Sequence, residues 1–494
     1  MARRADVCLI LEGTYPYVTG GVSSWTHDLL LAQKDLTFHL VTLLPKNANL
    51  TLRYQVPSNV VATSSVCIQE LPAGRSSIPR SREFFSALEG PLLGLQTGGG
   101  LDDLRGIIEV LKPVRQSAGS QLLLNSRQAW QMLLRMYASA VPRSSFLDFF
   151  WSWRSLVGGL YSVLLADLPD ASVYHAVCTG YAGLLLARAR LETGRPALIT
   201  EHGIYTNERR IEMAMADWLH DGMDDGLRID SGHRALTDVW VDTFVGYSRA
   251  CYEAATEIIT LYEGNQQFQL QDGADKAKLR IIPNGVDYER YSVVPRVRSA
   301  RPTIALIGRV VPIKDVKTFI RACAIVRCSV PDLQALVLGP TDEDRAYHDE
   351  CMDLVRHMRL EDTVTFTGRV KLDEYLGRID VLVLTSISEA QPLVVLEAGA
   401  LGIPSVTTDV GSCRDLILGP SAENPPLGPA GDVTPLCNPT ATAHALVRLL
   451  TDPDWYARCG SAIKNRVRVS YNKIGVDRTY HELYERHLAP AEAA

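Results

Sequence analysis

Two acidic residues in the second half of the chain, Glu389 and Glu397, have the types and spacing that could do chemistry. They lie eight positions apart, the first in a loop-like segment after an apolar run and the second within an apolar helical stretch. Pro392, between them, suits the first turn of that helix. A carboxylate buried among apolar residues needs a partner, and a pair of hydroxyls, as on a ribose, would supply one. A buried salt bridge at Glu397 and a solvated charge at Glu389 explain the pattern equally well.

Two cations precede this acidic pair in the sequence. Arg309 and Lys314 directly follow an apolar run expected to be a strand, and a helical pattern comes next. Cations at the end of a strand can stabilise the charge that develops on a departing nucleotide diphosphate, more strongly in the transition state than in the ground state. The alternative is an ordinary pair of solvated surface charges, and the position at a strand end favours the functional interpretation.

The first half contributes two further candidates. Gly20-Gly21 stands immediately before a helical pattern, where bare backbone N–H groups can approach an anion. Its spacing is not G-x-G-x-x-G, which disfavours a dinucleotide-dependent oxidoreductase, and a plain glycine turn explains it too. His202 follows an apolar strand-like run and precedes Gly203, a position suited to hydrogen bonding with a substrate. Most isolated histidines are nevertheless structural.

Alternating strand and helix patterns must position these residues. Strand, helix and strand succeed one another within residues 6–44, which predicts a βαβ unit and a parallel sheet. Residues 80–165 interrupt the rhythm and are expected to form a helical insertion, and residues 285–302 read as a linker. The expected strands are 6–11, 37–44, 172–176, 197–201 and 257–261 in the first half, and 303–308, 334–339, 363–367, 380–385 and 404–407 in the second.

The fold class predicted is therefore α/β, with two doubly wound domains facing each other across a cleft. The first would span residues 1–295 and the second residues 296–471, since 494 residues exceed what one hydrophobic core supports. Ligands of such sheets bind at the carboxyl ends of the strands, where the candidate residues lie.

Composition excludes several classes of protein. Fifty basic and 56 acidic side chains leave a net charge of −6, which argues against a nucleic-acid partner across the surface. Ten cysteines occur without any C-x-x-C pair, so a zinc ribbon is not predicted. The N-terminus lacks the apolar segment of a signal peptide, and no run is long and apolar enough to cross a membrane. We expect a cytoplasmic protein.

Five motifs together resemble glycosyltransferase family 4, the retaining enzymes of the GT-B fold. They are Pro-Asn-Gly-Val-Asp at 283–287, G-R-x-x-x-x-K at 308–314, E-x7-E at 389–397, the Ala-Gly-rich segment at 398–404 and Thr-Asp-Val-Gly at 408–411. The resemblance covers most of the second domain and implies two Rossmann-like domains. It also implies transfer of a hexosyl unit from a UDP-sugar, of the UDP-glucose or UDP-N-acetylhexosamine type, without a cofactor or an essential metal.

The resemblance assigns roles to individual residues. It makes His202, Glu389, Arg309 and Lys314 the catalytic residues, with the two cations on the diphosphate and Glu389 on a sugar hydroxyl. The nucleotide-sugar-binding residues that it implies are Gly20, Gly21, Arg309, Lys314, Arg369, Val370, Gln391, Pro392, Leu393 and Glu397, with Glu397 on the ribose. Ala390 departs from the glycine usual in the family, which bears on the shape of the sugar-facing loop.

A narrower resemblance involves the first domain. Residues 11–25 and 200–209 look like the cytosolic glycosyltransferases of Pel exopolysaccharide systems. This implies a growing polysaccharide as acceptor, and subunits of an inner-membrane synthase as partners that would hold the protein at the membrane. The GT-B fold further implies that a last helix, about 472–488, crosses back to the first domain. Two alternatives stay open: a sugar-nucleotide epimerase on the same fold, and a non-catalytic sugar-nucleotide-sensing subunit docked through the aromatic-rich stretch 146–161.

Overall fold

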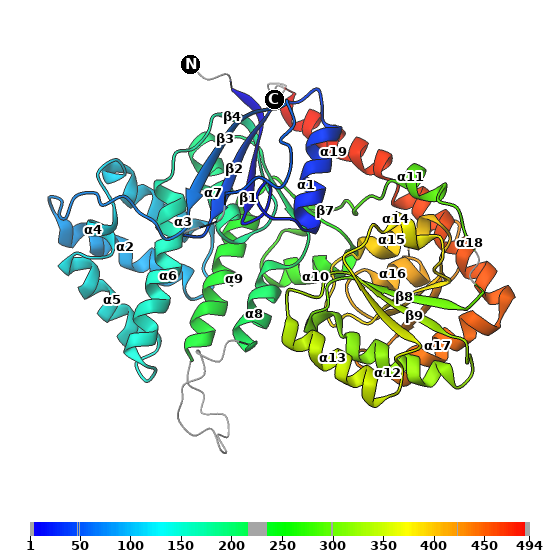
Figure 1. Ribbon diagram of the computed structural model, residues 1–494. Coiled ribbons are helices and arrows are strands. Elements are labelled where there is room, and N and C mark those ends of the chain that lie inside the picture. Colours follow the sequence, from blue (N-terminus) through cyan, green and yellow to red (C-terminus); the bar gives the residue numbers. More distant parts are fainter. Residues whose placement is uncertain are drawn as a thin grey trace. The chain divides into compact units, whose positions relative to one another are not determined.

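The computed structural model describes residues 4–46, 48, 50–215, 235–297, 300–421 and 423–489. The chain divides into two compact units, Met1–Ile281 with His481–Ala494, and Ile282–Tyr480. Each unit contains one parallel β-sheet with helices on its faces, as Figure 1 shows. The two-domain α/β architecture expected from the sequence is thereby confirmed.

The first unit is built on a seven-stranded sheet with the order β3-β2-β1-β4-β5-β6-β7. The strand order reverses between β1 and β4, the kind of switch point at which doubly wound sheets bind ligands. Every neighbouring pair of strands is parallel. The strands are β1 (Ala5–Glu12), β2 (Phe38–Leu44), β3 (Val60–Cys67), β4 (Ala171–Ala176), β5 (Ala197–Glu201), β6 (Glu257–Thr260) and β7 (Leu279–Ile281).

Helices cover this sheet, and five of them form the insertion between β3 and β4. The insertion corresponds to the segment expected at residues 80–165 and is seen at the left of Figure 1. The helices of the unit are α1 (Gly21–Ala32), α2 (Ser81–Leu95), α3 (Leu101–Leu111), α4 (Ser120–Leu123), α5 (Arg127–Ala140), α6 (Phe146–Leu165), α7 (Gly180–Thr193), α8 (Tyr205–Met215), α9 (Leu236–Ala254) and α10 (Glu263–Gln271), with short 3-10 turns at Lys112–Val114 and Lys276–Lys278.

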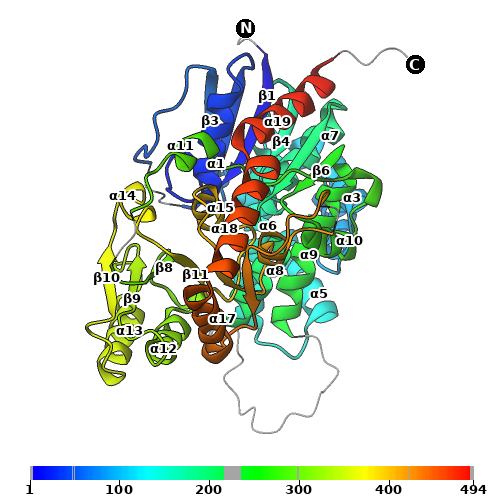
Figure 2. The same cartoon turned by 90° about the vertical axis from the view of Figure 1, so that its right-hand side faces the viewer.

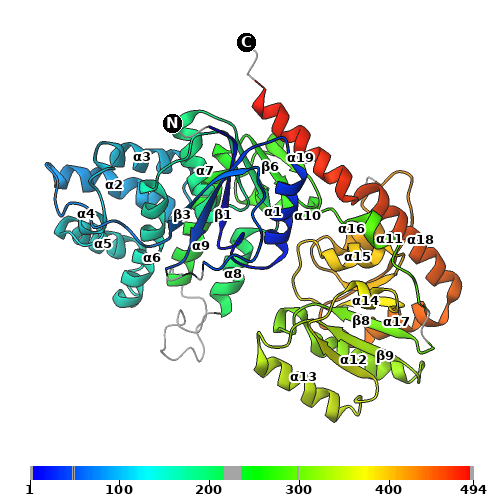
Figure 3. The ribbon, with the colours of Figure 1, turned by 45° about the horizontal axis from the view of Figure 1, so that its top comes forward.

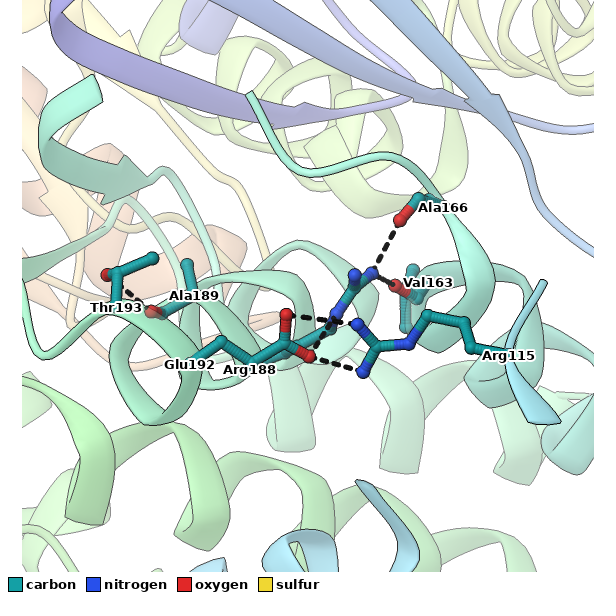
Figure 4. Close-up of polar contacts among 7 residues, drawn as sticks. All are labelled: Arg115, Val163, Ala166, Arg188, Ala189, Glu192 and Thr193. Carbon is teal, nitrogen blue, oxygen red and sulfur yellow. Dashed lines mark hydrogen bonds and ion pairs between the residues drawn. The ribbon is translucent and has the colours of Figure 1, made fainter. Parts of the chain in front are cut away.

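A buried arginine on α7 ties the insertion to the sheet (Figure 4). Arg188 donates hydrogen bonds to the carbonyl oxygens of Val163 and Ala166, at 2.8 and 2.7 Å, at the end of α6. Its Nε lies 2.9 Å from Glu192, which also pairs with Arg115 beyond the end of α3. Because the last carbonyls of a helix have no partners within the helix, these bonds satisfy the end of α6 and orient it against α7.

The second unit is built on a six-stranded parallel sheet with the order β10-β9-β8-β11-β12-β13. Figure 2 shows β10, β9, β8 and β11 side by side. The order reverses between β8 and β11, so this sheet has its own switch point. The strands are β8 (Thr303–Ile307), β9 (Gln334–Leu338), β10 (Val364–Gly368), β11 (Val381–Leu384), β12 (Ser405–Thr408) and β13 (Gly431–Thr434).

Helices pack on both faces of the second sheet. One buried apolar cluster joins it to α12, α13 and α17, and another joins it to α15, α16 and α18. Figure 3 shows α15 and α16 on one side of β8 and α12 and α13 on the other. The helices are α11 (Tyr288–Ser292), α12 (Val316–Arg327), α13 (Arg345–His357), α14 (Asp373–Leu376), α15 (Leu393–Ala400), α16 (Cys413–Leu418), α17 (Pro439–Thr451), α18 (Pro453–Ser470) and α19 (Lys473–Leu488), with a 3-10 turn at Pro312–Lys314.

The units divide at Ile281/Ile282, earlier than the boundary at residue 295 expected from composition. The segment after Ile281 already belongs to the second unit, because Val286 donates its N–H to the carbonyl of Tyr471 at 2.8 Å. The helix expected at 472–488 is α19, and its residues from His481 onward belong to the first unit. There the Tyr484 hydroxyl lies 2.7 Å from Nδ1 of His175.

Candidate active site

The carboxyl edge of the second sheet is made of bare backbone at three neighbouring strands. Gly308, Gly339 and Gly368 end or follow β8, β9 and β10, with φ of 157°, 153° and 69°. A Cβ on Gly339 would lie 2.0 Å from the carbonyl oxygen of Gly308, which no side chain tolerates. These φ values also favour glycine. At these three strand ends only backbone atoms are present, so any side chain at this edge comes from the adjoining loops.

Lys314 and Glu389, two of the predicted catalytic residues, meet at this edge. Nζ of Lys314 lies 2.5 Å from Oε1 of Glu389, and both side chains are mostly buried. The hydroxyl of Ser386 donates to the same carboxylate oxygen at 2.7 Å. A paired ammonium and carboxylate, with only part of each in contact with solvent, can hold a negatively charged group and a hydroxyl side by side.

Backbone contacts fix the two loops that carry this pair. Thr385 Oγ1 donates to the carbonyls of Lys314 and Asp315, at 3.0 and 2.9 Å. The N–H of Ile387 donates to the carbonyl of Ile313 at 2.8 Å. A Cβ on Gly411 would lie 2.2 Å from the carbonyl oxygen of Glu389, so this loop is close-packed from the other side as well.

Glu397 lies on α15, the helix that follows the loop of Glu389. It accepts a hydrogen bond from the hydroxyl of Tyr291 at 3.2 Å. Burial raises the pKa of Glu397, and the Tyr291 hydrogen bond partly offsets that rise. No salt bridge to Glu397 is formed within the described residues, so the buried ion pair considered from the sequence is not what the structure contains.

Gln391 links the start of α15 to the turn at residues 283–287. Its Oε1 accepts a hydrogen bond from the backbone N–H of Asn284 at 2.6 Å. Its Nε2 is buried and has no hydrogen-bond partner among the described residues, and the same holds for Oδ1 of Asn284. A buried amide donor without a partner costs free energy, and a ligand that accepts from it would remove that cost. Pro392 is the N-cap of α15, and Leu393 opens the helix half-buried.

Arg309 and the Arg369–Val370 segment lie further out. Arg309 forms an ion pair with Glu343, and its side chain is more than half exposed. Arg369 is exposed and Val370 half-buried, directly after β10. The sequence did not point to Glu343, because a single acidic residue in a polar loop carries no signal. The structure thus joins Lys314 to Glu389 directly, whereas the other predicted cation, Arg309, is paired with a different carboxylate.

In the first unit, a cavity of about 420 Å³ opens at the carboxyl ends of β1, β2 and β4. Glu12, the last residue of β1, accepts hydrogen bonds from the Tyr205 hydroxyl at 2.9 Å and from the N–H of Ala182 at 3.1 Å. Burial raises the pKa of Glu12. The cavity is lined by Glu12, Gly13, Thr14, Val22, Leu43, Pro45, Lys46, Ile68, Gln69, Val177, Cys178, Tyr205, Glu208 and Arg209.

Glu12, Tyr205 and Arg209 were not among the residues predicted for the site. The guanidinium of Arg209 lies 4.8 Å from the centre of the Tyr205 ring, whose hydroxyl bonds to Glu12. In the sequence, only their positions mark these residues, since Glu12 ends a buried strand and Tyr205 follows another. A charged residue at such a place lies at the ligand-binding edge of a doubly wound sheet.

The predicted residues of the first unit lie in two different environments. At Gly20 and Gly21 an added Cβ would meet nothing within 4 Å, so open space surrounds the start of α1. His202 is packed against Trp25, with ring centres 4.6 Å apart. Burial lowers the pKa of His202 to about 4, which makes the imidazole neutral at pH 7. Its Nε2 is buried and has no hydrogen-bond partner among the described residues.

The described part of the chain contains neither a cluster of metal-ligating side chains nor a membrane-spanning helix. No group of three His, Cys, Asp or Glu side chains there is arranged to hold a metal ion. Within the same ranges, every helix is too short or too polar to cross a bilayer.

Comparison with family models divides the chain as the structure does. Residues 5–277 match the family described as "Domain of unknown function (DUF3492)", which covers more than half of the chain. Residues 301–452 match "Glycosyl transferases group 1". The first match falls within the first unit and includes the helical insertion and the cavity. The second contains Arg309, Lys314, Glu389 and Glu397.

Curated relatives match through less than half of this chain. The D-inositol 3-phosphate glycosyltransferase of Kineococcus radiotolerans is 30% identical over 213 residues, 40% of this chain and 49% of its own. The Streptomyces scabiei protein of the same name is 28% identical over 227 residues, 42% of this chain and 47% of its own. The chain thus spans about half the length of the curated relatives it matches.

Solved structures match over nearly the whole chain. Anabaena HepE in complex with UDP has a TM-score of 0.59 at 13% identity, covering 97% of this chain and 99% of its own. Sucrose-phosphate synthase from Thermosynechococcus elongatus has a TM-score of 0.57 at 18% identity, covering 98% and 99%. At these identities the likeness concerns the fold, and it confirms the expected GT-B class.

Proposed function

The chain belongs to the family described as "Domain of unknown function (DUF3492)", and we propose that it is a retaining glycosyltransferase that uses a UDP-sugar. The transferred group would be a hexosyl unit, from a donor of the UDP-glucose or UDP-N-acetylhexosamine type. The match of residues 301–452 to glycosyl transferases supports this proposal, and so does the UDP bound in the structure of HepE. The observation that carries it is the contact between Lys314 and Glu389.

The ion pair between Lys314 and Glu389 would break when a donor binds, and each side chain would then contact a different part of the donor. The Lys314 ammonium would turn to the diphosphate, and the Glu389 carboxylate would accept a hydrogen bond from a sugar hydroxyl. Ser386 keeps the carboxylate oriented through its 2.7 Å hydrogen bond while this exchange takes place. Two adjacent side chains of opposite charge would thus match the two ends of a sugar–diphosphate linkage, one anionic and one rich in hydroxyls.

The neighbouring residues would bind the rest of the nucleotide. Glu397 would accept from the ribose hydroxyls, and the loop at Arg369–Val370 would contact the base. The backbone around Gln391 and Pro392 stands at the start of α15, where N–H groups and the helix dipole favour phosphate. Gln391 Nε2, a buried donor without a partner among the described residues, is available to the same ligand.

Retention would follow from attack on the face that the leaving group departs from. The β-phosphate would take the proton of the acceptor hydroxyl, and Lys314 with Arg309 would stabilise the departing charge. Removal of one such cation is expected to cost about 2.7–4 kcal/mol of transition-state stabilisation, by analogy with the loss of one oxyanion donor. These cations would take the place of a metal, so activity should persist in a chelator.

The first unit would bind the acceptor, which we propose is a growing exopolysaccharide, with the chain acting as a PelF-type protein. The resemblance of residues 11–25 and 200–209 supports this assignment. Gly20 and Gly21 border open space, and the nearby cavity offers the Glu12 carboxylate to sugar hydroxyls. His202, neutral at pH 7, would serve as a hydrogen-bonding group near the reacting sugar.

A donor panel with product analysis tests the proposal. Purified protein is incubated with UDP-hexoses and oligosaccharide acceptors, and both UDP release and the anomeric configuration of the product are measured. We expect UDP release with an α-linked product from an α-linked donor. Lys314→Ala and Glu389→Gln should each lower the rate about 100-fold or more.

Matched control variants lie on the same unit. Lys317 and Glu350 form an ion pair of the same length, 2.5 Å, on α12 and α13. Lys317→Ala and Glu350→Gln should leave turnover nearly unchanged. An altered hexose in place of transfer would establish the epimerase alternative, and donor binding without turnover would establish the sensing subunit. Either result contradicts the proposal.

A further inference from the structure

An exposed apolar surface lies on the helical insertion of the first unit. Leu147 and Trp151 are 62% and 60% exposed, and Trp130 is 44% exposed. Large aromatic side chains this accessible are unusual on a protein surface when they gather in one place. We call this surface the aromatic patch, and its residues are Trp130, Leu134, Phe146, Leu147, Phe150 and Trp151.

Ring contacts make the patch continuous across two helices. The Trp130 ring lies 5.7 Å from that of Phe146 and 5.8 Å from that of Phe150, between α5 and α6. The Phe150 ring lies 4.9 Å from that of Trp151. On α6, Leu147 and Trp151 are one turn apart and therefore share a face. Figures 1 and 3 show α5 and α6 next to each other within the insertion.

The charges around the patch are mainly positive. Arg127 precedes Trp130 by one turn of α5, and the exposed Arg143 lies in the connection between the two helices. The guanidinium of Arg154 lies 5.7 Å from the centre of the Phe150 ring. On α6 the corresponding acidic residue is Asp148. This local excess of positive charge contrasts with the net charge of −6 for the whole chain.

We propose that the aromatic patch docks the protein directly onto the surface of an anionic lipid bilayer. Tryptophan has an apolar body and a polar N–H, which suit the boundary between headgroups and acyl chains. Arginines at the rim complement the negative charge of anionic headgroups. Helices with such a face lie in the plane of the interface and need not span the bilayer. The aromatic patch shares no residue with the candidate active site, and its binding to a bilayer would not depend on the proposed activity.

Flotation of the full chain with lipid vesicles tests this inference. Vesicles of phosphatidylcholine alone are compared with vesicles that also contain phosphatidylglycerol, and bound protein is measured. The chain should bind the anionic vesicles, with a blue shift of tryptophan fluorescence. Binding should fall as salt is raised, because salt screens the arginines. Trp130→Ser combined with Trp151→Ser should weaken binding about tenfold or more.

Matched variants separate the patch from general surface effects. Phe268→Ser on α10 and Val469→Ser on α18 remove exposed apolar side chains elsewhere and should leave binding unchanged. Arg127→Gln with Arg143→Gln should abolish the preference for anionic vesicles. If the double tryptophan variant fails to fold, as judged by circular dichroism, Leu147→Asp provides the same test at a single exposed position.

Three outcomes would overturn the inference. The full chain could fail to bind either kind of vesicle, or the double tryptophan variant could bind as tightly as the unsubstituted chain. The patch could also join copies of the chain, in which case light scattering would detect an oligomer that the double variant dissociates while vesicle binding is unchanged. Vesicle binding that depends on an added partner protein counts as failure to bind.

Discussion

The two sheets expose different chemistry at corresponding edges. At the carboxyl edge of the second sheet, glycines close the strand ends, and an ion pair between Lys314 and Glu389 lies on the adjoining loops. At the carboxyl edge of the first, the strands themselves end in the carboxylates Glu12 and Glu201. Glu12 is half-buried and lines the cavity, Glu201 is fully buried, and both are hydrogen-bonded to neutral groups. The difference suggests that the second edge is built for an anionic ligand and the first for one rich in hydroxyls.

Replacement of a strand-end glycine should have the largest effect on stability. Gly339→Ala places a Cβ 2.0 Å from the Gly308 carbonyl oxygen at a φ of 153°. We expect a loss of about 4 kcal/mol or more in the free energy of unfolding of the second unit, at the upper end for single substitutions. Denaturant unfolding measures it.

Gly21→Ala is the matched change at the first sheet. There an added Cβ meets nothing within 4 Å, and the residue opens α1. Stability should be unchanged or rise by up to about 1 kcal/mol, because alanine favours the helix. Equal destabilisation by the two substitutions would contradict the contrast between a close-packed glycine edge and an open one.

The buried carboxylate at the end of β5 should make the first unit sensitive to pH. Burial raises the pKa of Glu201 to about 7, although Gln269, Tyr252 and Thr179 donate hydrogen bonds to it. Because the folded pKa exceeds the unfolded one, its contribution is fully present below about pH 4.3 and is lost as the pH rises towards 7. The expected loss is about 4 kcal/mol at most.

Comparison of the unsubstituted chain with Glu201→Gln isolates this contribution. Burial lowers the pKa of His175 to about 3, so that histidine destabilises the fold in the opposite direction, as the pH falls below about 6.5. Unfolding of the first unit is therefore measured for both proteins between pH 4.5 and 7.5. As the pH rises, the free energy of unfolding of the unsubstituted chain should fall relative to that of Glu201→Gln. A difference independent of pH would show that Glu201 does not titrate in this range.

Loss of one hydroxyl beside Glu397 should have the smallest effect. Tyr291→Phe removes the 3.2 Å hydrogen bond to the carboxylate, worth about 1 kcal/mol. Because that bond lowers the pKa of Glu397, the pKa should rise in the variant. The affinity for UDP should therefore fall by up to about fivefold, most strongly at low pH, as measured by calorimetry. Tyr375→Phe on α14, a tyrosine with no such bond in the described structure, is the control. Equal effects of both substitutions on UDP affinity would contradict a role of the Tyr291–Glu397 hydrogen bond in binding the ribose.

The sequence predicted the buried strands well and the exposed or short ones poorly. Runs such as 303–308 and 197–201 are apolar because both faces of a parallel sheet are covered, and the structure contains β8 and β5 there. The strands β3, β7 and β13 were not predicted. In β3 every residue is exposed or half-buried, and β7 has three residues, so neither carries the pattern of a buried strand.

For the candidate site, the sequence identifies suitable residue types, but the fold determines which side chains contact one another. Lys314 and Glu389 stood out by position and by family resemblance, but their contact depends on the pairing of β8 with β11, which brings the loops after both strands together. The pairing of Arg309 with Glu343 is likewise a property of the folded loops. For Glu12 the sequence offers only its position at the end of a strand, and a solvated acidic residue at a strand end has the same pattern.

Calorimetric titration of UDP into the chain and into Lys314→Ala tests the central claim most directly. Lys317→Ala, which breaks an ion pair of the same length on α12, is the matched control. If the Lys314–Glu389 pair belongs to a nucleotide-sugar site, the unsubstituted chain and Lys317→Ala should bind UDP alike, and Lys314→Ala should bind about tenfold or more weakly. Equal affinity of Lys314→Ala and Lys317→Ala for UDP would contradict the claim.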